Sequence, residues 1–155
     1  MLYNLLFPLA DGAGFFNLFQ YLTFRTGGAV LTGLLVSFLC GPALIRALKI
    51  RQGKGQPIRA DGPEGHLLTK QGTPTMGGVL ILLALLAGTL LWADLTNAYV
   101  WILLFVTLGF GAIGFMDDYL KVRRQHSDGV PGRIKLVLEI AIALGATFWI
   151  VSISA

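Results

Sequence analysis

Residues 98–121 read AYVWILLFVTLGFGAIGFMDDYLK, an almost uninterrupted apolar run that ends at two adjacent acids, Asp117 and Asp118. The apolar part, 98–116, is close to the ~20 residues that a helix needs to cross a ~30 Å hydrocarbon layer. Because each run must satisfy its own backbone hydrogen bonds in lipid, a helix is the expected form. Three further runs of this kind lie at about 26–45, 76–95 and 134–153.

The composition of the whole chain agrees with a membrane protein. Hydrophobic residues make up 55% of the 155 residues and charged residues only 13%, against about 25% charged in an ordinary soluble domain. We therefore predict an all-α fold, a polytopic bundle of four transmembrane helices that forms a single transmembrane domain over residues 1–155. Cys40 is the single cysteine, so an intrachain disulfide is excluded. With only His66 and His126 to add, a zinc site is not expected.

The segment before the first apolar run has a different character. It is apolar but has no basic leader, so it does not resemble a secretory signal peptide. Aromatic residues recur at helical spacing between Phe15 and Leu22, with polar residues between them. This pattern is typical of an interfacial helix at the membrane surface. An outward extension of the first span explains the same residues equally well.

The cations predict how the chain crosses the membrane. Six of the twelve Lys and Arg residues lie within 46–75, five lie between Asp117 and Lys135, and Arg25 is the twelfth. The positive-inside rule therefore predicts two cytoplasmic loops, 46–75 and 117–133, and an external N-terminus. This topology explains the net charge of +4 without a nucleic-acid partner.

The second and third runs are joined by a very short link, Asp94 to Asn97. Two helices joined so closely must form an antiparallel hairpin. The start of the second run, near Thr75, is then expected beside the end of the third run, near Asp117.

Asp117 and Asp118 are the first candidate functional residues. On a helix, Lys121 shares a face with both acids. Adjacent carboxylates repel each other unless a cation lies between them, and Mg²⁺ with a phosphate is a common partner. Alternatively, one carboxylate has a raised pKa and acts as a base. A structural alternative is a polar cap with an Asp117–Lys121 ion pair, but acids at a helix C-terminus oppose the macrodipole, which favours a functional role.

The stretch KQGTPTMGG, residues 70–78, is the second candidate. Thr73 or Thr75 could cap the helix that follows, with Pro74 in its first turn. The free N–H groups of a helix N-terminus suit a phosphate, and Lys70 would add a positive charge. A well-capped helix with a packing face of small residues explains the same stretch without a ligand.

Other polar segments give weaker signals. The basic, Gly/Pro-rich loop 51–66 could be a linker or a lid over a cytoplasmic site. Cations such as those near the fourth run normally determine topology and contact anionic lipid. Lys135 also has the spacing of an i,i+4 pair with Glu139. Together, the candidates suit a phosphate or diphosphate substrate with a partner held in the membrane.

Three strings of the sequence resemble a known family. They are RADGPEGH at 59–66, KQGTPTMGG at 70–78 and MDDYLK at 116–121. Together they closely resemble the phospho-N-acetylmuramoyl-pentapeptide transferases, the MraY family of the polyprenyl-phosphate N-acetylhexosamine-1-phosphate transferase superfamily. The resemblance covers essentially the whole chain, with Gly65 where a serine is expected.

The resemblance implies a reaction. It is the transfer of phospho-MurNAc-pentapeptide from UDP-MurNAc-pentapeptide to undecaprenyl phosphate, which gives lipid I and UMP in peptidoglycan biosynthesis, with Mg²⁺ as cofactor. Asp117 and Asp118 match the family's catalytic, metal-binding acid pair. The residues that match substrate-binding positions are Lys70, Thr75, Lys121 and, more weakly, Arg133. The resemblance also implies a homodimer in the bacterial inner membrane, with a periplasmic N-terminus and a cytoplasmic active face.

This chain is much shorter than members of that family. We therefore expect it to be the N-terminal part of such a protein, without a later aspartate and a later histidine-rich loop that complete the site. By itself it is expected to be inactive, and transferase activity of the purified chain would refute this.

Other interpretations stay open from sequence. A sister transferase would use UDP-N-acetylglucosamine, although the GTPTMGG string argues against it. A small transporter would place its acids deeper within a span. A non-catalytic membrane fragment would bind only partners or lipid. Within the transferase interpretation, either Asp117 deprotonates the lipid phosphate for direct attack, or an aspartate forms a phosphoryl-enzyme intermediate.

Overall fold

The structure is a computed structural model, and it describes residues 2–6, 14–52, 75–125 and 129–154. Within these ranges the regular structure is entirely helical, which confirms the predicted all-α class. The elements in chain order are α1 (Leu2–Leu6), the 3₁₀ helix η2 (Gly14–Gln20), α2 (Leu22–Gln52), α4 (Gly78–Trp92), α5 (Ala98–Arg124) and α6 (Gly132–Ser154).

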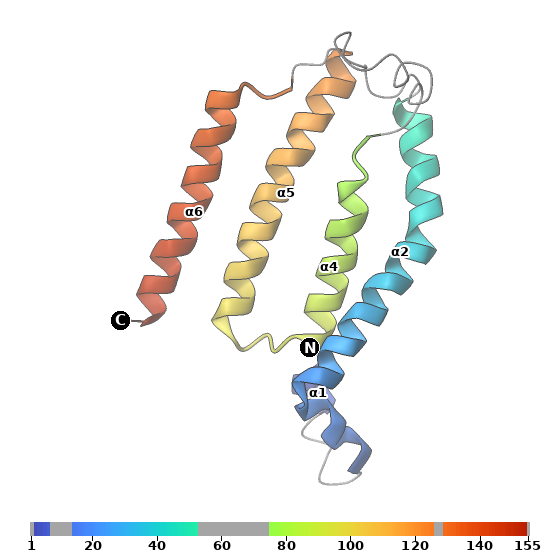
Figure 1. Cartoon of the computed structure of the whole chain (residues 1–155), viewed down its shortest axis with the longest axis vertical. Helices are drawn as coiled ribbons and strands as arrows, with labels where there is room; N and C mark the ends of the chain where they lie inside the picture. Colours follow the sequence, from blue (N-terminus) through green and yellow to red (C-terminus); the bar gives the residue numbers. More distant parts are fainter. Residues whose placement is uncertain (1, 7–13, 53–74, 126–128, 155) are drawn as a thin grey trace.

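The four long helices lie side by side in the order α2, α4, α5 and α6 (Figure 1). The α2–α4 and α5–α6 interfaces are the most extensive, and α4 and α5 share a smaller one. Large apolar side chains remain exposed along these helices, such as Phe38 at 75% and Phe148 at 78%. An exposed apolar surface of this extent marks a contact with membrane or protein. The helices therefore have the surface of a multi-pass membrane protein.

Four apolar helices lie where the four spans were predicted, but their lengths differ from the predicted ones. Among the described residues, α2, α5 and α6 are long and apolar enough to cross a membrane. Helix α4 has only 15 residues, so at ~1.5 Å per residue it is roughly 22 Å long. The expected run 76–95 starts too early, because Met76 has a φ of 71° and lies in the left-handed region. It ends too late, because Ala93 is extended.

Two helices continue beyond their predicted ends. Helix α2 reaches Gln52 instead of 45, and α5 reaches Arg124 instead of 116. No Gly or Pro interrupts either extension, and cations in the last turn of a helix complement its macrodipole. The predicted cytoplasmic loops 46–75 and 117–133 therefore both begin as helix.

The N-terminal aromatic segment packs against the bundle. Phe19 is 7% exposed, stacks on Trp92 with ring centroids 5.9 Å apart, and meets Phe24 edge-on at 5.3 Å. The Trp92 indole Nε1 donates to Thr32 Oγ1 at 2.8 Å. The segment 14–20 is a 3₁₀ helix, and α2 begins at Leu22, outward of the predicted span start at 26, so the two alternatives from sequence both stay open. The position of this segment at the membrane surface stays a prediction.

The link between α4 and α5 forms the predicted antiparallel hairpin. Asp94 Oδ1 accepts hydrogen bonds from the backbone N–H and the hydroxyl of Thr96, which hold the pKa of the Asp94 carboxyl below its ordinary value. The Asn97 side chain caps α5 by accepting from the Tyr99 N–H at 2.9 Å. The start of α4 and the end of α5 consequently lie at the same end of the row (Figure 1).

Helices α2 and α4 approach each other closely at Gly88. A Cβ atom added there would lie 3.0 Å from the backbone oxygen of Ala29, whereas one added at Gly114 of α5 would meet nothing within 4 Å. We expect Gly88→Val to lower the free energy of unfolding by about 1–3 kcal/mol through overpacking. Thermal unfolding in detergent measures this, with Gly114→Val as the matched control that causes no such loss. Equal losses in the two variants would contradict the packing described.

Candidate functional site

The two acids lie within a helix rather than at its end. Helix α5 continues from Asp117 to Arg124, about two further turns. The acids therefore do not lie in the last turn, where they would oppose the helix macrodipole.

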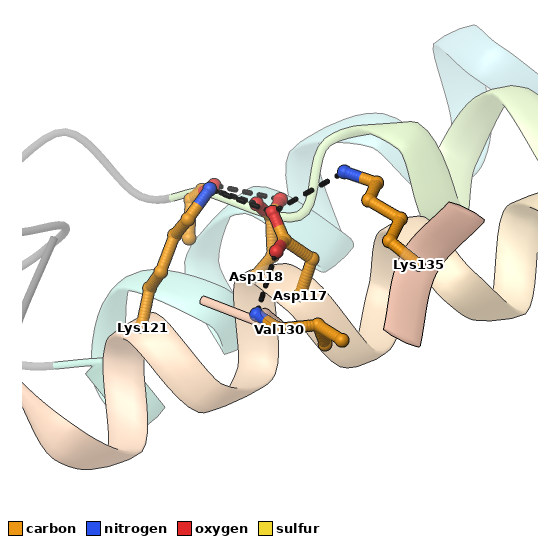
Figure 2. Close-up of polar contacts among 6 residues, drawn as sticks. Asp117, Asp118, Lys121, Val130 and Lys135 are labelled. Carbon is orange, nitrogen blue, oxygen red and sulfur yellow. Dashed lines mark hydrogen bonds and ion pairs between the residues drawn. The ribbon is translucent and has the colours of Figure 1, made fainter. Parts of the chain in front are cut away.

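Asp117 is held by groups from two helices and from the segment between them (Figure 2). Its Oδ2 lies 2.7 Å from the Lys121 Nζ and 3.9 Å from the Lys135 Nζ of α6. Its Oδ1 accepts a hydrogen bond from the Val130 N–H at 2.9 Å. Its side chain is only 13% exposed. Charge-assisted bonds of this kind stabilise the ionised carboxylate.

Asp118 has fewer partners and is more open, with 31% of its side chain exposed. Its Oδ2 accepts a hydrogen bond from the Thr75 hydroxyl at 2.9 Å. Its Oδ1 lies 4.0 Å from the Lys121 Nζ. This confirms the expected proximity of the two ends of the hairpin, and the expected grouping of Lys121 with both acids.

Thr75 does not cap α4, contrary to the prediction. The N-cap of α4 is Gly77, which makes no side-chain capping bond. The hydroxyl of Thr75 is instead directed to Asp118. Thr73 and Pro74 lie outside the described residues.

Gln52, the last residue of α2, lies at the site and was not predicted from the sequence. Its side chain forms two hydrogen bonds with the backbone of Thr75: Gln52 Nε2 donates to the Thr75 oxygen at 3.0 Å, and the Thr75 N–H donates to Gln52 Oε1 at 2.8 Å. Gln52 is 7% exposed. Nothing in the sequence distinguishes this glutamine from a solvated residue at the end of a basic helix, because its partner is distant along the chain.

The other cations and the loop singled out in the sequence have different outcomes. Arg133 is exposed on α6 and forms no ion pair with the described part of the chain. Lys70 and most of the loop 51–66, including His66, lie outside the described residues. Lys135 pairs with Asp117 and not with Glu139, which corrects the i,i+4 pairing suggested by spacing.

A cavity of about 380 Å³ opens beside the acids, between α4 and α5. Asp117 and Asp118 form its polar part, and its remaining walls are largely apolar. A larger and almost wholly apolar groove, of about 770 Å³, runs along the same two helices past Phe115 and Tyr119. The carboxylates therefore adjoin apolar surface, an arrangement that suits a ligand with a charged head and an apolar chain.

The two carboxylates are oxygen ligands of the kind that Mg²⁺ prefers. No cluster of three or more His, Cys, Asp or Glu residues suited to a metal occurs among residues that the structure describes. Mg²⁺, however, commonly uses one or two carboxylates together with water and substrate phosphates. Asp118 fits this role, because the Lys121 Nζ lies 4.0 Å from its Oδ1, beyond hydrogen-bonding distance, and so leaves that oxygen accessible to a ligand. Asp117 fits less well, since both of its oxygens already accept hydrogen bonds.

Gly129 lets the segment before α6 lie against Asp117. A Cβ atom at Gly129 would collide with the Asp117 carboxylate, whereas one at Gly132 would meet nothing within 4 Å. Gly129→Ala should therefore displace the carboxylate from the Val130 N–H and lower the free energy of unfolding by about 1–3 kcal/mol. Thermal unfolding in detergent tests this, with Gly132→Ala as the control. A Gly129→Ala protein as stable as that control would show that the Val130 bond contributes little.

Comparison with known proteins relates this site to a family. Residues 70–82 match the phospho-N-acetylmuramoyl-pentapeptide-transferase signature 1. Thr75 and the first turn of α4 belong to this segment.

Two curated relatives carry the same name. The chain is 62% identical over 149 residues to the phospho-N-acetylmuramoyl-pentapeptide-transferase of Maricaulis maris (strain MCS10), an alignment that covers 96% of this chain and 41% of that protein. It is 60% identical over 154 residues to the protein of the same name from Granulibacter bethesdensis (strain ATCC BAA-1260 / CGDNIH1), covering 99% of this chain and 42% of that protein. By sequence, the chain is therefore similar to the phospho-N-acetylmuramoyl-pentapeptide-transferases, and it spans about two fifths of the length of the curated relatives that it matches.

Proposed function

We propose that this chain supplies the acid-pair part of an active site that transfers phospho-MurNAc-pentapeptide from UDP-MurNAc-pentapeptide to undecaprenyl phosphate, giving lipid I and UMP. The observation that carries the proposal is the Thr75–Asp118 hydrogen bond of 2.9 Å. It joins the signature segment at the start of α4 to the acids of α5. A signature residue and a candidate catalytic residue thus belong to one polar cluster.

The charges of the cluster support a phosphorylated substrate. Lys121 and Lys135 both lie within 4.0 Å of Asp117, so two ammonium groups border the acids. Lysine is a common phosphate ligand because its ammonium group acts as a compact positive charge. The apolar groove beside the cluster, which passes Tyr119 and Met116, supports a second substrate with a long apolar chain.

In the proposed reaction, an oxygen of the lipid phosphate forms a bond to the β-phosphorus of the UDP-linked substrate. The bond from that phosphorus to the bridging oxygen breaks, and UMP leaves with the bridging oxygen. Asp118 is the better placed of the two acids to take a proton from the lipid phosphate, because it is more exposed and has fewer partners. Asp117 would mainly hold Lys121 in position.

The covalent alternative assigns an aspartate as the nucleophile. In that case an aspartate oxygen first bonds to the β-phosphorus and UMP leaves. The lipid phosphate then attacks the same phosphorus in a second step and releases the aspartate. A phosphorylated aspartate trapped during turnover would favour this version over direct attack.

Mg²⁺ is the proposed cofactor, held by Asp118 and less directly by Asp117. When bound, it would neutralise negative charge on the diphosphate and on the departing UMP. The remaining positions around the ion would be filled by water and by substrate oxygens.

The proposed location is the bacterial inner membrane, with the acid pair on the cytoplasmic face and the N-terminus in the periplasm. Support comes from the cations of α2 and α5, which gather in the last turns of these helices. The C-terminal ends of α2 and α5 lie at the same end of the row of helices (Figure 1), and the acids lie about two turns before the end of α5. The positive-inside rule assigns such an end to the cytoplasm.

Substitution of the acids tests the proposal. We expect Asp118→Asn in the product of the whole gene that encodes this chain to lower kcat at least about a hundred-fold, since an essential acid–base group is lost. Lipid I formation from UDP-MurNAc-pentapeptide and undecaprenyl phosphate is the measurement. Asp94→Asn, at the opposite end of the row, is the matched control and should leave turnover close to that of the wild type.

The same assay separates the sister reaction. Competition by unlabelled UDP-N-acetylglucosamine should be negligible if the pentapeptide substrate is correct. Turnover of UDP-N-acetylglucosamine in its place would identify the sister transferase, and an undiminished kcat in Asp118→Asn would remove Asp118 from the mechanism.

Metal removal gives an independent test. We expect EDTA to abolish lipid I formation and Mg²⁺ to restore it, because the diphosphate charge is then neutralised again. Titration of Mg²⁺ into the Asp118→Glu variant should require a higher concentration for half-maximal rate than the wild type. Full activity after complete chelation would contradict a magnesium-dependent reaction.

A further inference from the structure

The Gln52–Thr75 contact joins two helices at the candidate site. Gln52 ends α2, and Thr75 stands three residues before the first residue of α4. Both side-chain atoms of Gln52 that can form hydrogen bonds are used, one as donor and one as acceptor, at 3.0 and 2.8 Å. A glutamine that satisfies both backbone groups of one residue fixes the position of that residue more strongly than a single bond could.

Burial makes this contact important. Gln52 is 7% exposed and is the one buried polar side chain in the described part of the protein. A buried polar side chain lowers stability unless it is hydrogen-bonded. The same holds for the backbone N–H and C=O of Thr75 if they lose Gln52 as their partner. Helix α2 therefore holds Thr75 through a contact whose loss would lower the free energy of unfolding.

Thr75 passes this restraint on to the acids. Its backbone is held by Gln52, while its hydroxyl donates to Asp118 Oδ2 at 2.9 Å. Its neighbour Met76 has a φ of 71°, a conformation that side chains of L-residues rarely adopt. Such a backbone persists only where surrounding contacts determine it, and Gln52 supplies contacts of this kind.

We propose that Gln52 is a positioning residue for the transfer reaction: by holding the Thr75 backbone, it aims the Thr75 hydroxyl at Asp118 and so fixes the orientation of that carboxylate. The proposal rests on the proposed function. Gln52 touches neither the acids nor the cavity beside them, so its effect must act through Thr75.

The test uses Gln52→Met, which keeps the length and bulk of the side chain but removes both hydrogen bonds. In the product of the whole gene, we expect kcat to fall about ten-fold, the effect of a lost hydrogen bond of ordinary strength. KM for UDP-MurNAc-pentapeptide should change little. Gln125→Ala is the matched control, because Gln125 is exposed and its one hydrogen bond within the described residues is to the Val122 oxygen, three residues away. Its kcat should stay near that of the wild type.

A double substitution decides whether Gln52 acts through Thr75. In the Thr75→Val background, the hydroxyl that Gln52 positions is gone, so adding Gln52→Met should lower kcat by less than two-fold further. A full additional ten-fold loss would overturn the proposal, because Gln52 would then act by another route. An unchanged kcat in the single Gln52→Met variant would overturn it as well.

Hydrogen exchange separates this proposal from the proposed function. Amide exchange at Thr75, followed by mass spectrometry in detergent, should be faster in Gln52→Met than in the wild type or in Gln125→Ala. If the wild type forms no lipid I but Thr75 exchanges faster in Gln52→Met, the proposed function fails and the restraint on Thr75 is supported. If exchange at Thr75 is unchanged, the positioning role is overturned whatever the activity.

Discussion

The short link between α4 and α5 is the constraint on which the rest of the site depends. Residues 93–97 leave no length for the chain to return before α5 begins, so the two helices must run in opposite directions. The first turn of α4 is thereby brought beside the acids near the end of α5, and Thr75 reaches Asp118. Side-chain capping by Asn97 and the turn around Asp94 stabilise this geometry at the far end of the hairpin.

The two acids, although adjacent in sequence, have different surroundings. Asp117 faces α6 and the Val130 N–H, and its ionised form is held by Lys121 and Lys135. Asp118 faces α4 and keeps more of its surface open. Adjacent residues on a helix point about 100° apart, so neighbouring carboxylates naturally meet different helices. One acid can therefore serve as an anchor while the other remains available to a ligand.

Much of this arrangement could be predicted from the sequence. The apolar runs, the hairpin, and the common face of Lys121 and both acids follow from periodicity and spacing, which are local properties. The start of α4 could not be predicted, because it depends on the left-handed backbone of Met76. The roles of Gln52 and Val130 also escaped prediction, since both bind groups that only tertiary packing brings near. The pairing of Lys135 with Asp117 was missed because Glu139 was the nearer partner in sequence.

The extension of α5 beyond the acids affects how deep the two carboxylates would lie in a membrane. Because the helix is continuous, Arg123 and Arg124 lie roughly 8–11 Å further along its axis than the two carboxylates. A bilayer that holds these guanidinium groups among its headgroups would keep the carboxylates near the boundary with the acyl chains. The length of this helical segment would then set the depth of the acids. In the proposed reaction, the phosphate of the lipid substrate would reach them without leaving the headgroup layer. The thickness of the surrounding membrane would then influence whether the lipid phosphate can reach the acids.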